Sequence, residues 1–196
     1  MRQKRWEKAE EIFQRILEVS TKDSSKIHRA RWDAFRNLGK LYQSTDKLPE
    51  AEVAYSRALK EQMRHGANSG VINLTMMGLG DVYFGMKHLT LAAQMYESVL
   101  NLQATRPNAD YIMRTIAAKE LAYIYMAMKR YGEAETLFLR AKDGYTEWLG
   151  PSDQRTLDVA RELQRINARR AESARASPRP HAIQETPCSG GESGSS

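Results

Sequence analysis

The feature that most restricts the fold of this chain is a set of apolar residues that returns at a nearly constant interval. Two independent groups of small and branched residues are spaced 41 and 42 residues apart. The two groups are Leu38, Leu79 and Leu121, and Ala51, Ala92 and Ala134. Such an interval predicts a repeat architecture, in which each unit buries its apolar face only by stacking on its neighbours.

Within one unit, the local spacing predicts two helices. The segment from Asn37 to Leu59 places apolar residues three or four positions apart on both sides of a polar break, which is the period of a helix with one apolar face. Asp46 is a candidate N-cap for the second helix, and Pro49 lies in its first turn, where a missing N–H costs nothing. In the next unit we expect Gly80 and Ala92 to face each other across a close helix pair.

The pattern of Leu and Gly, then Tyr, then Ala with an aromatic residue four positions later resembles the tetratricopeptide repeat. The usual repeat has about 34 residues, and the longer unit here resembles the repeats of kinesin light chains and of related arrays common in fungal proteins. The segment from Trp148 to Leu163 is similar to the linker between repeats of that family, with Leu-Gly-Pro, a polar pair and Thr-Leu. The resemblance implies an all-α fold, a right-handed superhelical solenoid of antiparallel helix pairs.

Polar breaks divide the chain into units. We expect a repeat domain over residues 1–170 and a disordered tail, rich in Pro, Ser and Gly, over residues 171–196. The repeat domain is expected to contain a half repeat, three full repeats and a capping helix, at about 4–19, 26–65, 70–104, 110–147 and 156–170. Because the half repeat matches only the second helix of a unit, we expect either an atypical cap or a piece of a longer parent protein.

Composition excludes several classes of protein. Cys188 is the single cysteine, so one chain can form neither a disulfide framework nor a thiol cluster for a metal. This usage fits a reducing compartment. The N-terminal stretch lacks the apolar run of a signal peptide, and no stretch approaches about 18 uncharged apolar residues. We therefore expect a cytoplasmic protein that does not bind a membrane.

No pattern of catalytic or cofactor-binding residues is found. The histidines occur in different units, as His28, His65, His88 and His181, without a metal-ligand spacing such as HExxH. The string GLG lies inside a predicted helix and not after a strand, so it does not form a dinucleotide loop. No histidine has a nucleophilic residue and an acidic residue placed around it in the pattern of a nucleophile–base arrangement. The sequence predicts a non-enzyme with no cofactor and no metal.

Binding is expected on the concave face, which this architecture builds from the first helix of each unit. A helical projection gives that face an apolar, Met-rich middle and basic clusters at both ends. Methionine adapts to varied side chains, and arginine pairs well with carboxylates. The candidate groove residues are Arg36, Asn37, Lys40, Met77, Asp81, Lys119, Tyr123, Arg161 and Arg165.

The resemblance to kinesin light chains implies a partner of matching chemistry, an extended peptide with a hydrophobic anchor and acidic flanks. Asn37 corresponds to the groove asparagines with which that family grips a peptide backbone. The alternative for Met77 and Tyr123 is simple packing between neighbouring first helices. The leading prediction is a protein- or peptide-binding scaffold.

Two other functions compete with the scaffold. A chain that starts in mid-repeat is compatible with a sensor or oligomerisation arm of a larger protein, such as a fungal nucleotide-binding receptor. The excess of 30 basic over 24 acidic side chains is compatible with nucleic-acid binding. However, Lys and Arg alternate with Glu throughout, which favours ordinary solvated helix faces, and no exposed face interleaves aromatic with basic residues. Nucleic acid is therefore the least favoured partner.

Overall fold

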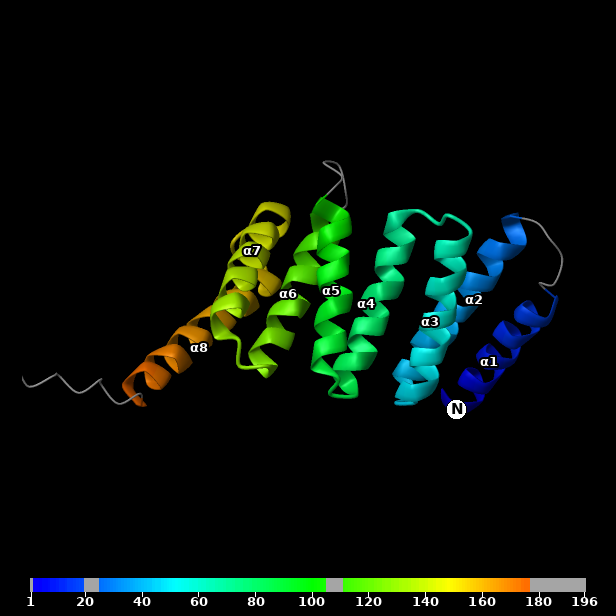
Figure 1. The fold of residues 1–196 in the computed structure, drawn as a ribbon, viewed down its shortest axis with the longest axis horizontal. Coiled ribbons are helices and arrows are strands. Elements are labelled where there is room, and N and C mark those ends of the chain that lie inside the picture. Colours follow the sequence, from blue (N-terminus) through cyan, green and yellow to red (C-terminus); the bar gives the residue numbers. More distant parts are fainter. Residues whose placement is uncertain (1, 20–24, 105–110, 177–196) are drawn as a thin grey trace, which may run out of the picture.

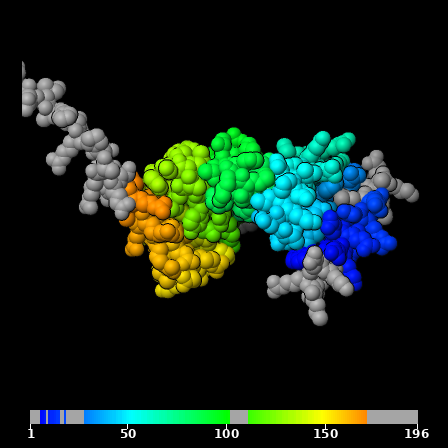
Figure 2. Space-filling view, turned by 90° about the horizontal axis from the view of Figure 1, so that it is seen from below, coloured from blue at the N-terminus to red at the C-terminus, as the bar shows by residue number. Residues whose placement is uncertain are grey.

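The protein is a row of helices. The computed structural model describes residues 2–19, 25–104 and 111–176, and this part of the chain contains eight helices and no strand. The helices are α1 (Arg2–Val19), α2 (Ser25–Ser44), α3 (Leu48–Arg64), α4 (Ser69–Gly85), α5 (Leu89–Ala104), α6 (Tyr111–Ala127), α7 (Tyr131–Leu149) and α8 (Gln154–Ala176). Each packs against the next, in chain order from one end of the molecule to the other (Figure 1). The result is an elongated body (Figure 2), which confirms the predicted all-α stack over the described ranges.

The two helices of each repeat are joined by the same turn, three times. In each turn one residue has a left-handed backbone conformation. In chain order these residues are Asp46, Lys87 and Lys129, with φ of 60°, 64° and 61°. The next N–H donates to the carbonyl five residues back, from Lys47 to Tyr42 at 2.9 Å in the first repeat and at 2.8 Å in the other two. This pairing is the Schellman motif, which satisfies carbonyl groups left over at the end of a helix.

The predicted role of Asp46 is therefore wrong. Asp46 belongs to the C-terminal cap of α2, and the residue at the N-cap of α3 is Lys47, whose side chain makes no capping bond. The backbone bonds of the turn already fix the path of the chain into α3, so the helix starts without a side-chain cap. Pro49 does lie in the first turn of α3, as predicted.

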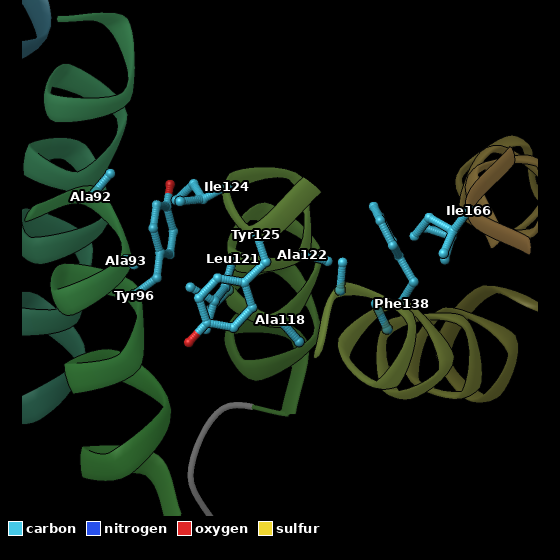
Figure 3. Packing of buried hydrophobic residues seen from close by; sticks show 14 of the residues in the cluster. Ala92, Ala93, Tyr96, Ala118, Leu121, Ala122, Ile124, Tyr125, Phe138 and Ile166 are labelled. Atoms are coloured by element: carbon cyan, nitrogen blue, oxygen red, sulfur yellow. The ribbon is translucent and has the colours of Figure 1, made fainter. Parts of the chain in front are cut away.

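The repeating register determines which residues are buried. Its small, aromatic and branched positions are all inaccessible or nearly so in every repeat. These positions are Ala51, Ala92 and Ala134; Tyr55, Tyr96 and Phe138; and Leu38, Leu79 and Leu121. Figure 3 shows how Tyr96, Leu121, Phe138 and Ile166 fill the space between successive helices from α5 to α8. The register predicted from the sequence is confirmed by this burial.

Two glycines allow tyrosine rings to lie directly on the first helices. A Cβ on Gly39 would lie 2.8 Å from the ring of Tyr55, and one on Gly80 would lie 2.7 Å from Cε2 of Tyr96. Both distances are far shorter than a normal carbon–carbon contact. The atoms nearest to the Cβ position of Gly80 belong to Tyr96 and Met95, whereas the expected approach of Gly80 to Ala92 stays a prediction. The space above Gly80 is filled by an aromatic ring one turn further along α5.

Neighbouring repeats are joined by a tyrosine that donates a hydrogen bond to a glutamate of the preceding helix pair. The pairs are Tyr42 with Glu10 at 2.6 Å, Tyr83 with Glu52 at 3.1 Å, and Tyr125 with Glu97 at 2.5 Å. The tyrosines follow the leucine register, whereas Glu97 lies one turn beyond the position that the register gives it. The bond is conserved in space although one partner has moved in sequence.

The last helix is longer than the sequence suggests. α8 runs to Ala176, whereas the capping helix was expected to end at residue 170. Residues 177–196 of the expected tail lie outside the described residues. Among the described helices, none combines the length and the apolar character needed to cross a bilayer.

Candidate functional site

Three helices enclose a hollow on the face where the sequence predicts a groove. The hollow measures about 430 Å³ and lies between α4, α6 and α8, which are first helices of successive units. We call it the groove hollow. It is lined by Phe84 of α4, by Glu120, Tyr123, Met126 and Ala127 of α6, and by Glu162, Arg165 and Arg169 of α8.

The apolar part of the groove hollow is fixed by the core beneath it. Phe84, Tyr123 and Met126 are half-buried and pack against the large core cluster. The ring of Tyr123 meets Phe138 edge-on, with centroids 5.0 Å apart. Burial raises the pKa of the Tyr123 hydroxyl, and the nearby carboxylate of Glu162 raises it further. The phenol is therefore neutral around pH 7 and can donate a hydrogen bond.

The rim of the groove hollow carries both signs of charge. Arg165 donates to Glu162 at 2.8 Å within α8. Glu120 is paired with Lys119 at 2.8 Å. Burial, the largest single influence, would lower the pKa of Lys119, but the hydrogen bond and charge of Glu120 together with the nearby hydroxyls of Tyr145 and Tyr123 leave the pKa raised. Arg169 is exposed and forms no ion pair with any residue that the structure describes, so it is the cation most available to a ligand.

A partly buried group of hydrogen-bonded side chains, which includes the exposed Asp81, continues the face from the groove hollow toward α2. The hydroxyl of Tyr96 donates to Oδ1 of Asp81, and the hydroxyl of Tyr55 donates to Oε1 of Gln43 at 3.2 Å. The Gln43 side chain also lies near Asp81 and lowers the pKa of its carboxyl. Although Asp81 keeps some open surface, the protein around it raises the pKa of the carboxyl, and Glu120 adds to the rise while Tyr96 opposes it. The network ties four helices, α2 to α5, at one point.

The basic clusters expected at the two ends of the groove are weaker than predicted. Three arginines each pair with an acid one turn earlier in their own helix. The pairs are Arg36 with Asp33 at 2.9 Å, Arg161 with Asp158 at 2.7 Å, and Arg165 with Glu162 at 2.8 Å. Pairs at this spacing share their charge and contribute little attraction to a distant ligand. Lys40 is exposed and has no ion pair within the described ranges.

The structure distributes the nine candidate residues over three places. Tyr123 and Arg165 line the groove hollow. Asp81 and Lys119 lie beside it, close enough to Glu120 for their charges to interact. Five candidates do not line the groove hollow, namely Arg36, Asn37, Lys40, Met77 and Arg161. Met77 is half-buried and packs against the core cluster, as the packing alternative proposes.

Sequence reasoning missed two arrangements on the described surface. One is the position of Gln43 beside Tyr55 and Asp81. Local sequence spacing could not predict it, because both neighbours lie on other helices. The histidines were placed in different units, and this is wrong for two of them. His28 of α2 and His65, directly after α3, belong to one repeat, and their rings stack with centroids 3.6 Å apart and an angle of 15° between planes. The antiparallel course of α2 and α3 brings the start of one helix to the end of the other.

Comparisons with known proteins give the family. Two family models described as tetratricopeptide repeats match residues 1–60 and residues 117–156. The fold is similar to BtubC (BKLC) from P. vanneervenii, with a TM-score of 0.73 and 18% identity over 89% of this chain and 68% of that one. A search of curated proteins finds no match.

Two fungal structures are also similar. One is a kinesin light chain-like protein of Podosopora anserina with nearly identical TPR-like repeats, at a TM-score of 0.69 and 20% identity over 89% of this chain and 84% of that one. The other is the TPR domain of Sgt2 from Aspergillus fumigatus, at a TM-score of 0.57 and 16% identity over 80% and 91% of the two chains. These likenesses confirm the right-handed superhelical solenoid. The chain belongs to the tetratricopeptide repeat superfamily, and its fold is similar to that of kinesin light chain-like repeats.

Proposed function

We propose that this protein is a non-catalytic interaction scaffold that binds an extended peptide along the face formed by α2, α4, α6 and α8. The observation that carries the proposal is the groove hollow, whose apolar floor is surrounded by charged side chains. Ligand sites usually combine an apolar concave surface with a few converging polar groups. The membership of the superfamily supports a scaffold, since stacked repeats of this kind create extended concave binding surfaces.

The groove hollow selects an apolar anchor. Its volume of about 430 Å³ accommodates one large side chain such as Leu, Met or Phe. Phe84, Tyr123 and Met126 would cover that side chain, and full burial of such a group contributes about 1.5–3 kcal/mol. Met126 can adapt to anchors of different shape. The hydroxyl of Tyr123 is available to a peptide carbonyl.

Charge orients the peptide on either side of the anchor. On α8, Arg169 and the partly neutralised Arg165 would favour an acidic flank. On α2, exposed Lys40 offers a further positive charge. Between them, Asp81 and Glu120 would disfavour an acidic residue. The proposed ligand is thus a peptide with one apolar anchor and acidic residues mainly on the α8 side.

The test begins with selection of binders from a displayed random-peptide library, followed by fluorescence anisotropy with the best labelled peptide. Tyr123→Ala should weaken binding by about tenfold or more, since tenfold corresponds to about 1.4 kcal/mol. Leu139→Ala, a matched change at an exposed site on α7, should leave affinity unchanged. Circular dichroism verifies folding, and Arg169→Glu, at an exposed site, provides an independent variant. Equal affinity for the wild type and both groove variants contradicts the proposal.

A second candidate function is association through α1. Trp6 and Ile12 of α1 are 40% and 58% exposed, so this terminal helix presents apolar surface at the end of the stack (Figure 1). Ile12→Glu should abolish any concentration-dependent self-association seen by sedimentation. If the wild type stays monomeric at all concentrations, association through α1 in this form is ruled out.

A further inference from the structure

The first repeat gathers three potential metal ligands at one end of its helix pair. His28 of α2, Glu61 of α3 and His65 each offer one ligand atom, and the three atoms lie within 4.8 Å of one another. Glu61 and His65 also contact each other, at 3.5 Å between carboxylate and Nε2. All three residues are partly buried, with 19% of the Glu61 side chain and 24% of the His65 side chain exposed.

The local fold brings these residues together. Glu61 and His65 are four residues apart, so they lie on one face of α3 and its C-terminal cap. His28 lies in the first turn of α2, which runs antiparallel to α3 and therefore begins where α3 ends. Its ring stacks on that of His65. The helix pair thus brings two imidazoles and a carboxylate together, one from the start of α2 and two from the end of α3 and its cap.

The repeat architecture does not require this cluster. In the register set by Ala51 and Ala134, the corresponding residues of the third repeat are Tyr111, Gly144 and Trp148. There the tyrosine hydroxyl donates to Glu147 at 2.6 Å instead. Both repeats fold in the same way. Because stacking is possible with or without the histidines, the cluster is free to serve a purpose of its own.

We propose that His28, Glu61 and His65 form a binding site for one divalent transition-metal ion, of which Zn²⁺ is the model. Imidazole nitrogens with a carboxylate oxygen suit Zn²⁺, Cu²⁺ and Ni²⁺, whereas Ca²⁺ and Mg²⁺ take oxygen ligands. Two histidines and one glutamate are a known zinc ligand set that leaves a fourth position open. Water or a donor atom of a bound partner would occupy that position.

Only side-chain rotation is needed to close the site. Around a tetrahedral zinc ion with bonds of about 2.0–2.2 Å, ligand atoms lie about 3.3–3.6 Å apart. The present spacing within 4.8 Å therefore leaves at most about 1.2–1.5 Å to close. The two rings must also turn out of their face-to-face stack, so that a nitrogen of each points to a common centre.

A bound ion would join the open end of the first repeat. At its other end, α2 and α3 are connected through the turn at Asp46. The metal would add a crosslink between the start of α2 and the end of α3, and an ion that binds only the folded state stabilises it by mass action. We therefore expect Zn²⁺ to raise the melting temperature by roughly 5–10 °C at about 100 times its Kd.

The full chain, stripped of metal by a chelator, is titrated with Zn²⁺ by calorimetry, and Co²⁺ serves as an absorbing probe of tetrahedral coordination. One equivalent should bind. Loss of an outer-shell partner alone typically weakens metal binding by about 10–100-fold. His28→Ala and His65→Ala each remove a proposed direct ligand and should weaken Zn²⁺ binding by more than that. Glu61→Gln, which preserves shape and removes the charge, should weaken binding as well and addresses any folding defect of the alanine variants.

A matched control removes the remaining histidines and the single cysteine of the chain. In the triple variant His88→Ala, His181→Ala, Cys188→Ser, the proposed site is intact, and both the affinity and the rise in melting temperature should equal those of the wild type. The proposal is overturned if the wild type does not bind a stoichiometric ion. It is equally overturned if the triple variant loses binding, or if His28→Ala, His65→Ala and Glu61→Gln retain wild-type affinity.

Discussion

The first and third repeats are both pairs of packed helices, α2 with α3 and α6 with α7, but their side chains fill the space between helices to different extents. From α5 to α8, buried residues form one continuous cluster (Figure 3). Around α2 and α3 the buried residues divide into two small clusters, and a hollow of about 390 Å³ remains between α1, α2 and α3. Phe35 and Val53 line it. The shared register thus determines where the helices lie. How completely the space between them is filled depends on the helix packed next to the pair, α1 for the first repeat and α8 for the third.

The ends of the two repeats differ as well. The first holds the stacked pair of His28 and His65, and the third holds a bond between Tyr111 and Glu147. None of these residues is among the repeated core positions. Positions outside the register therefore differ in chemistry between two repeats that both keep the stack.

The largest expected effect tests the difference in core filling. Phe138 is fully buried in the third repeat, whereas Phe35 borders the hollow of the first and is 9% exposed. Phe138→Ala should destabilise the fold by about 3–5 kcal/mol, because it creates a cavity in a filled core. Phe35→Ala should cost clearly less, since it enlarges a space that already exists. Urea unfolding followed by circular dichroism measures both, and an equal loss would show that the two cores are filled alike.

A smaller effect is expected where a ring covers a glycine. Gly80→Leu forces side-chain volume into the ring of Tyr96, 2.7 Å from the added Cβ, and should cost about 1–3 kcal/mol or more. Gly132→Ala in α7 is the matched change at an open site, with nothing within 4 Å of its Cβ. It should be neutral or slightly stabilising. An unchanged melting midpoint for Gly80→Leu would contradict the packing described for α4 and α5.

The tyrosine bonds between repeats allow a direct comparison of the two regions. Tyr125 is buried where it binds Glu97, whereas Tyr42 is only half-buried where it binds Glu10. Tyr125→Phe should lower the free energy of unfolding by about 1 kcal/mol. Tyr42→Phe should lower it by less, because the bond of the half-buried Tyr42 competes more with water. Thermal melts decide the order. The reverse order would mean that the N-terminal junction is the tighter one.

Alkaline pH should act on the same bonds. Burial, followed by the neighbouring glutamate, raises the pKa of both Tyr42 and Tyr125 to about 12, against about 10 in an unfolded chain. The folded state then holds these protons more tightly, so their contribution is complete below pH 10 and is lost as the pH rises toward 12. Melts between pH 9 and 12 should show this decline, and Tyr125→Phe should reduce its slope. A stability independent of pH in this range would contradict the raised pKa values.

Much of the fold could be predicted because the register is a property of the sequence alone. The intervals between Leu38, Leu79 and Leu121 were sufficient to define the stack. The turn was misread at Asp46, because its left-handed conformation is set by backbone bonds and not by a side-chain cap. The contact of Gly80 with the ring of Tyr96 was not predicted, because it depends on a side chain that reaches across from another helix.

The groove was harder to predict than the fold. Helical spacing could have shown that Arg36 is paired with Asp33 and Arg165 with Glu162, since these pairs lie three residues apart. It could not show that Gln43 lies near Asp81 of another helix. Nor could it show the meeting of His28 with His65, which depends on two antiparallel helices of matched length.

The most direct test of the central claim, that the groove hollow binds the anchor of a peptide, separates association from dissociation by stopped flow with a selected peptide. Tyr123→Ala should raise the dissociation rate by about 10–100-fold, which corresponds to the loss of about 1.4–2.8 kcal/mol of anchor contact. Arg169→Glu should instead slow association at low salt, with an effect that fades as salt screens the charge. Arg64→Glu, a matched reversal on exposed α3, should change neither rate. If Tyr123→Ala and Arg169→Glu leave both rates at wild-type values, the groove hollow is not the binding site.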